Sequence, residues 1–159
     1  MLTIYKKNII FIFLSCFIIT NYLYAGDCYV YKSQDTGVFD DGENFEDGSE
    51  SNPFDTIQEC IENLSNNRNN TIHIGSGIYK IDDTNIGARR LIGSGVNVTH
   101  LVPSSNSSVG IITQGGEIAH IAFKRNSTFG EDYQFNAAIQ ITDTNDSYYT
   151  EIHNCAFLG

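Results

Sequence analysis

The chain has 159 residues, of which nine are basic and nineteen acidic, so its formal net charge at neutral pH is −10. An acidic chain repels phosphate backbones, and no basic stripe interrupts it, so nucleic acid is excluded as an expected partner. The length is that of one domain. Tryptophan is absent and proline occurs twice, whereas asparagine, serine, threonine, glycine and isoleucine are plentiful, which suits a solvated β-solenoid better than a helical bundle.

Residues 1–25 have the pattern of a secretory signal peptide. Two lysines precede an apolar run over Ile9–Ile19, and Ala25 supplies the small residue before the expected cleavage point. The run is shorter than the roughly 20 residues that span a membrane comfortably, so we expect no stable membrane insertion after cleavage. A lipoprotein with Cys16 as the lipidated residue is the alternative. The mature chain is therefore expected to be secreted or extracytoplasmic, in the periplasm or at the cell surface.

Three cysteines remain after cleavage, namely Cys28, Cys60 and Cys155. In an oxidising compartment we expect one disulfide and one leftover thiol. Cys28 and Cys60 flank the predicted N-terminal cap and are the preferred bridge. Cys155 is then free, or pairs with a cysteine outside this sequence. The chain has no CxxC pair and no Cys/His cluster, so no metal site is predicted.

Residues 26–70 read as an acidic loop followed by a cap with one helix. Carboxylates are frequent from Ser33 to Ser51, but the glycine and glutamate offsets of an EF-hand are missing, so a solvated loop is expected. Asp55 is the predicted N-cap of the helix and Gln58 its capping-box partner. Apolar residues at i, i+3, i+4 and i+7 give the helix one apolar stripe: Ile57, Cys60, Ile61 and Leu64. We expect this stripe to seal the open apolar end of the segment that follows.

Residues 71–159 consist of short β-type segments separated by glycine, asparagine or serine. The predicted segments are 71–74, 78–81, 90–92, 99–102, 110–112, 117–123, 138–141 and 151–157. Isoleucine is their usual inward residue, as expected on a pleated, half-buried surface.

Two architectures compete for these segments. A β-sandwich favours Asp-Gly or Asn-Gly hairpin turns, but Asp41-Gly42 and Asp47-Gly48 both precede the strand region. A loose repeat of roughly twenty residues is typical of a solenoid instead. Its predicted coil starts lie near Thr71, Arg90, Gly110 and Ala138, with an inserted polar loop over 127–135. The sequence therefore predicts an all-β parallel β-helix with one capping helix.

Three motifs resemble those of pectin lyase-like right-handed parallel β-helix proteins. Asp47–Gln58 reads DGSESNPFDTIQ and resembles the cap of that superfamily. Thr71–Tyr79 is similar to its first strand with the G-x-Y turn, and Leu91–Gly95 resembles the next turn. The motifs come in family order and cover most of residues 28–123. The superfamily holds polysaccharide lyases, polygalacturonases, pectin methylesterases and non-enzymatic adhesins, so the resemblance implies a fold and not one activity.

A weaker similarity concerns pectin methylesterases. Residues 137–139 and 152–159 look like the region just upstream of that family's catalytic Gln-Asp, but the position of its oxyanion-stabilising glutamine holds Asn136. The two aspartates and the arginine of that mechanism have no counterpart before Gly159. We therefore predict no catalytic and no cofactor-binding residue in this chain, and expect an incomplete stack that ends midway.

Two functions follow from the resemblance. The first is a non-catalytic secreted protein that binds polysaccharide or a cell-surface component. The alternative is the N-terminal part of a carbohydrate-active enzyme, pectate lyase-like or pectin methylesterase-like, that acts on acidic polysaccharide.

Three further sets of residues invite a functional interpretation. The histidines His73, His100, His120 and His153 are expected on solvated outward faces, with a metal-binding or groove-lining ladder as the alternative. Arg89 and Arg90 are interpreted as a surface pair without a partner, with a grip on a uronate carboxylate as the alternative. Glycosylation is expected only in a eukaryotic secretory pathway, at the sequons of Asn63, Asn69, Asn97, Asn106, Asn126 and Asn145.

Overall fold

The computed structural model describes residues 26–31, 47–106, 109–127, 133–142 and 149–159. This part of the chain is predominantly β and has one short helix. No helix in it is long and apolar enough to cross a membrane. The predicted signal peptide and most of the predicted acidic loop lie outside the described residues.

The strands form three sheets, which we call sheets 1, 2 and 3. Sheet 1 contains, in spatial order, β1 (Asp27–Val30), β2 (Thr71–Ile74), β5 (Arg90–Gly93), β8 (Gly116–Ala119) and β11 (Thr150–His153). Sheet 2 contains β3 (Gly77–Ile81), β6 (Thr99–Pro103), β9 (Ala122–Lys124) and β12 (Ala156–Leu158). Sheet 3 contains β4 (Thr84–Gly87), β7 (Val109–Thr113) and β10 (Ala137–Ile141).

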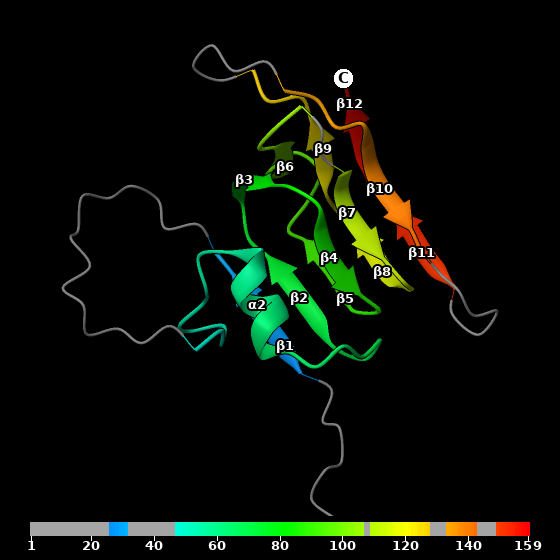
Figure 1. Cartoon of the computed structure of the whole chain (residues 1–159). Helices are drawn as coiled ribbons and strands as arrows, with labels where there is room; N and C mark the ends of the chain where they lie inside the picture. The colour runs from blue at the N-terminus through cyan, green and yellow to red at the C-terminus, as the bar shows by residue number, and fades with distance from the viewer. Residues whose placement is uncertain (1–25, 32–46, 107–108, 128–132, 143–148) are drawn as a thin grey trace, which may run out of the picture.

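From β2 onward the chain enters sheets 1, 2 and 3 in rotation, and the strands of each circuit pair with those of the circuit before (Figure 1). Every pairing between these named strands is parallel. A β-sandwich would instead join its strands through antiparallel hairpins. The predicted parallel β structure is therefore confirmed, and its topology is compatible with a parallel β-helix.

The length of a circuit increases along the chain. Registered neighbours in sheet 1 are 19, 27 and 34 residues apart, as the column of paired residues shows: Ile72, Leu91, Ile118 and Ile152. The predicted repeat of roughly twenty residues holds for the first circuit alone. The predicted circuit starts near Gly110 and Ala138 are wrong, because both residues lie in sheet 3, on β7 and β10. A constant repeat length no longer predicts where each circuit begins once the connections between strands lengthen.

Two of the predicted segments each contain a bend between two sheets, and the sequence pattern gives no sign of it. Residues 117–123 and 151–157 each divide into a strand of sheet 1 and a strand of sheet 2. At the corners, His120 has φ 61° and Asn154 has φ 50°, so the backbone visits the left-handed region and changes direction. Strands β1 and β4 were not predicted at all.

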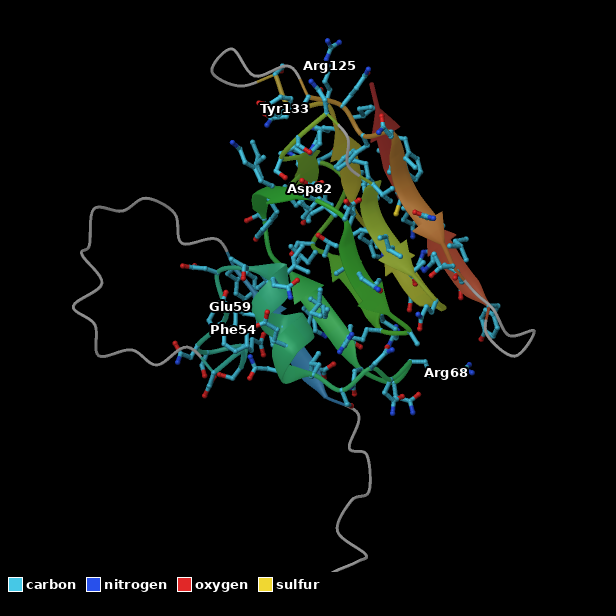
Figure 2. The ribbon with its side chains drawn as sticks, viewed as in Figure 1. Phe54, Glu59, Arg68, Asp82, Arg125 and Tyr133 are labelled. Atoms are coloured by element: carbon cyan, nitrogen blue, oxygen red, sulfur yellow. A yellow bond between two sulfur atoms is a disulfide. The ribbon has the colours of Figure 1, made fainter. Side chains whose placement is uncertain are left out.

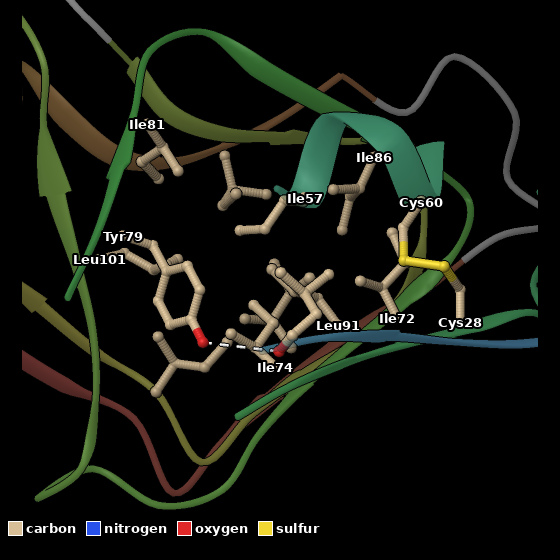
Figure 3. Packing of buried hydrophobic residues seen from close by; sticks show 14 of the residues in the cluster. Cys28, Ile57, Cys60, Ile72, Ile74, Tyr79, Ile81, Ile86, Leu91 and Leu101 are labelled. Carbon is tan, nitrogen blue, oxygen red and sulfur yellow. Dashed lines mark hydrogen bonds between the residues drawn. A yellow bond between two sulfur atoms is a disulfide. The ribbon is translucent and has the colours of Figure 1, made fainter. Parts of the chain in front are cut away.

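The helix α2 (Ile57–Asn63) packs against β1 and β2. Figure 3 shows Ile57 and Cys60 directed into the cluster that holds Ile72 and Ile74. The predicted N-cap of the helix, Asp55, lies one residue before the observed N-cap. Thr56 is the N-cap, because its hydroxyl accepts from the Glu59 N–H at 3.3 Å while the Glu59 carboxylate accepts from the Thr56 N–H at 3.0 Å.

A disulfide joins Cys28 of β1 to Cys60 of α2, which is the pairing the sequence favours. Cys155 is the free thiol of the described residues. It is half-buried, and burial raises the pKa of its thiol. The disulfide and the free thiol confirm the expectation of one bridge and one unpaired cysteine among Cys28, Cys60 and Cys155.

Apolar side chains of successive circuits stack on one another. In sheet 2 the column begins with residues that are almost fully buried, and its last member is 56% exposed: Tyr79, Leu101, Phe123 and Phe157. The rings of Phe123 and Phe157 are parallel, with centroids 5.3 Å apart. The core is thus built from contacts between neighbouring circuits, as in repeat proteins.

Candidate functional site

A hollow of about 190 Å³ lies on the outer face of sheet 1, over β5, β8 and β11. In these strands Leu91 and Ile118 are buried inward, so the alternating residues face outward. The hollow is lined by Arg68, Asn69, Arg90, Gly116, Glu117, Tyr149 and Glu151. Figure 2 shows Arg68 extending from the loop between α2 and β2 beside this sheet.

Glu117 connects three neighbouring strands across the hollow. Its carboxylate accepts from Arg90 Nε at 2.7 Å and from His153 Nε2 at 2.8 Å. Burial alone would raise the pKa of the Glu117 carboxyl, but the hydrogen bonds and charges of Arg90 and His153 outweigh it and hold the pKa below its ordinary value. Glu117 is therefore a charged acceptor that links β5, β8 and β11.

An exposed aromatic ring borders the same hollow. Tyr149 is 69% exposed, and the guanidinium carbon of Arg68 lies 5.7 Å from the centre of its ring. This is cation–π distance, so the two side chains attract each other weakly. The hollow thus presents one apolar ring face beside a mixture of hydrogen-bond donors and acceptors.

The hollow includes residues that the sequence did not single out. Glu117 sits in the predicted segment 117–123, where the alternation places it outward, but nothing along the chain indicates that it meets Arg90 and His153. Arg68 and Tyr149 lie in predicted loops and carry no periodic signal. Their proximity comes from the register of sheet 1, which pairs Thr71 with Arg90 and Thr150 with Gly116.

The four histidines do not form one ladder. His73 and His153 lie in the same outward column of sheet 1 but are separated by β5 and β8. His100 is on sheet 2, where Lys124 Nζ donates to its Nε2 at 2.9 Å, and burial followed by the Lys124 charge lowers the pKa of His100. His120 sits at a corner, with its ring edge-on to His153. No group of three metal-ligating side chains gathers in the described part of the chain.

The predicted unpartnered arginine pair is wrong for both residues. Arg90 pairs with Glu117. Arg89 is buried, and its guanidinium donates to the carbonyl oxygens of Ile61 and Leu64 at the end of α2 and to that of Ile86. The last carbonyls of a helix have no partner within the helix, so Arg89 satisfies groups that would otherwise be orphaned. Arg89 therefore has no side-chain donor directed to a ligand on the outer face.

The predicted glycosylation sequons differ in how exposed their asparagines are. Asn126 is buried and donates to the carbonyl oxygen of Pro103 at 3.2 Å, so a glycan there is incompatible with the folded chain. Asn145 lies outside the described residues. The exposed sequon asparagines are Asn63, Asn69, Asn97 and Asn106.

Glu117 makes stability depend on pH. Because its pKa is lower in the folded than in the unfolded chain, its stabilisation is present above the ordinary glutamate pKa of about 4.3 and is lost as pH falls through the folded value. We expect Glu117→Gln to cost at most about 1 kcal/mol of unfolding free energy near pH 6, and this cost to shrink toward pH 3. Urea unfolding at several pH values measures it. Glu151→Gln, an exposed neighbour, is the control; the same pH dependence in both variants would refute the prediction.

Among known proteins, no family model, no curated protein and no solved structure matches this chain. The resemblance to pectin lyase-like proteins thus remains a prediction from the cap and turn motifs, and the functional argument depends on the residues of the hollow.

Proposed function

We propose that this chain is a secreted, pectin lyase-like right-handed parallel β-helix protein that binds polysaccharide through the hollow on sheet 1. The rotation of the chain through three parallel sheets supports the β-helix, with α2 acting as a lid over the first circuit. The Cys28–Cys60 disulfide is compatible with an oxidising, extracytoplasmic compartment. The N-terminal basic and apolar pattern supports export.

The chemistry of the hollow is the observation that carries the proposal. Sugar hydroxyls both donate and accept hydrogen bonds, and the faces of sugar rings are apolar. Arg68, Arg90 and Asn69 offer donors, while Glu117 and Glu151 offer acceptors. The exposed ring of Tyr149 offers a flat apolar surface with little conformational freedom to lose on binding. A mixed, shallow and preformed surface of this kind suits a saccharide.

The direct test is binding of the full chain to a panel of neutral and acidic polysaccharides, by affinity electrophoresis and then calorimetry. We expect Tyr149→Ala to weaken binding about tenfold, a loss typical of removing an aromatic side chain that contacts the ligand. Phe157→Ala is the matched control, because it removes another exposed ring from a different sheet. A protein that binds no member of the panel would refute the proposal.

The enzyme alternative predicts turnover, and we expect none. A general acid at neutral pH needs a raised pKa, whereas that of Glu117 is lowered by its two partners. Incubation with methylated and unmethylated polygalacturonate should therefore release neither methanol nor unsaturated or shortened products. Release of either above that of a Glu117→Gln variant would favour the carbohydrate-active enzyme.

A further inference from the structure

An aromatic cluster lies on the outer face of sheet 1, at the opposite edge from the hollow. The ring of Tyr29 on β1 stacks on His73 of β2, with centroids 4.7 Å apart and planes 14° apart. The ring of Tyr31 follows at 6.4 Å from Tyr29 and is 38% exposed. We call Tyr29, Tyr31 and His73 the aromatic patch.

The backbone makes room for this patch. Cys28 and Val30 are buried, so the alternation of β1 turns Tyr29 outward. A Cβ atom on Gly75 would lie 1.9 Å from Tyr31 Cδ1, so the absence of a side chain at Gly75 lets the Tyr31 ring lie over the end of β2. The rings thus form a surface on the sheet, fixed by packing on the strands below.

Among the described residues, two carboxylates, Asp27 and Glu50, lie near the aromatic patch. Asp27 Oδ1 lies 3.2 Å from His73 Nε2. Burial, and then the charges of Glu50 and Asp27, raise the pKa of the Tyr29 hydroxyl, which stays protonated as a donor. A ligand that carries a carboxylate on each sugar would meet two carboxylates here, and like charges across an interface oppose binding.

The aromatic patch and the hollow belong to one continuous sheet. The patch lies on β1 and β2, while the hollow lies over β5, β8 and β11, and these five strands are hydrogen-bonded in that order. Neighbouring strands are about 4.8 Å apart, so β1 and β11 are separated by about 19 Å. That distance fits several linked sugar rings in a chain that crosses the strands.

We infer that the aromatic patch is a second saccharide subsite and that the ligand is a linear glycan of uncharged sugars lying across the strands of sheet 1. The inference rests on the proposed function and narrows its ligand class. A sugar ring places its apolar face on Tyr31 or on the face of Tyr29 that His73 does not cover, and its hydroxyls donate to Asp27. The hollow contains two arginines and two glutamates, so their formal charges cancel. The carboxylates near the aromatic patch then make the binding face negative, which disfavours uronate ligands.

The test is calorimetric titration of the full chain with cellohexaose, N-acetylated chitohexaose and hexagalacturonate at one ionic strength. We expect an uncharged hexasaccharide to bind at least about tenfold tighter than hexagalacturonate. Tyr29→Ala should weaken that binding about tenfold, whereas Tyr29→Phe, which keeps the ring, should stay within about threefold of the wild type. Phe157→Ala is the control for loss of an exposed ring elsewhere.

A charge-reversal variant keeps the inference testable if Tyr29→Ala does not fold. Asp27 is exposed, and Asp27→Lys should raise the affinity for hexagalacturonate several-fold. If hexagalacturonate is the tighter ligand of the wild type, or if Tyr29→Ala binds an uncharged hexasaccharide as well as the wild type does, the inference is overturned. If Tyr149→Ala still weakens binding in either of these cases, the proposed function stands. If no hexasaccharide and no polysaccharide binds, both fail.

Discussion

Replacing Cys28 and Cys60 together with alanine is expected to lower the free energy of unfolding by about 3–4 kcal/mol. The bridge joins residues 32 positions apart and so restricts the unfolded chain. It also ties together two short elements, since β1 has four residues and α2 has seven. A helix of two turns is not stable alone in water, so α2 depends on its attachment to the sheet. Urea unfolding followed by circular dichroism measures the loss.

The matched control for the disulfide is the third cysteine. Cys155→Ala removes a half-buried thiol that forms no bridge, and we expect a cost of less than about 1 kcal/mol. Addition of a reductant should bring the wild type to the stability of the double variant and leave the double variant unchanged. If the double variant and Cys155→Ala lose equal stability, the disulfide is not what attaches α2 to the sheet.

Replacing Arg89 with methionine is expected to cost about 2–4 kcal/mol. The guanidinium is buried and donates to three carbonyl oxygens, two of which belong to the end of α2. Methionine fills similar space but removes the donor from all three acceptors; the bond to Ile86 is buried and those to Ile61 and Leu64 are partly buried, so water can replace the donor only in part. The loss should appear in thermal and urea unfolding.

The neighbouring arginine provides the comparison. Arg90→Met removes a partly exposed ion pair with Glu117, for which we expect a cost of about 0–1 kcal/mol. A larger loss for Arg90→Met than for Arg89→Met would contradict the assignment of the two roles. Arg89→Lys should fall between the wild type and Arg89→Met, because one ammonium group cannot match the geometry of a guanidinium.

The parallel β structure was predictable because inward isoleucines recur in short segments. Ile72 and Ile118 lie in such segments and are fully buried in the structure. The helix was predictable from the spacing of Ile57 and Cys60, since four residues on one face leave a clear periodic signal. Its cap was misplaced by one residue, because Asp55 and Thr56 are both good caps and the choice depends on where the backbone becomes helical.

The functional residues were less predictable. Arg89 and Arg90 are adjacent in sequence, and nothing local indicates that one is buried under α2 while the other faces outward. The structure separates them because Arg90 begins β5 and Arg89 lies in the turn before it. Likewise, Tyr29 and His73 are far apart along the chain, and only the register of β1 with β2 stacks their rings.

The spacing of the column from Ile72 to Ile152 has a consequence for how this fold varies between proteins. The strands of sheet 1 keep their register although the connections between them differ greatly in length, and doubling a flexible loop costs only about 0.6 kcal/mol of closure entropy. Insertions in the connections between strands are therefore nearly neutral for stability, while a one-residue slip within a strand reverses inside and outside. Related chains would share a few short strand motifs, scattered at unequal intervals, and comparison by a fixed repeat length would overlook them.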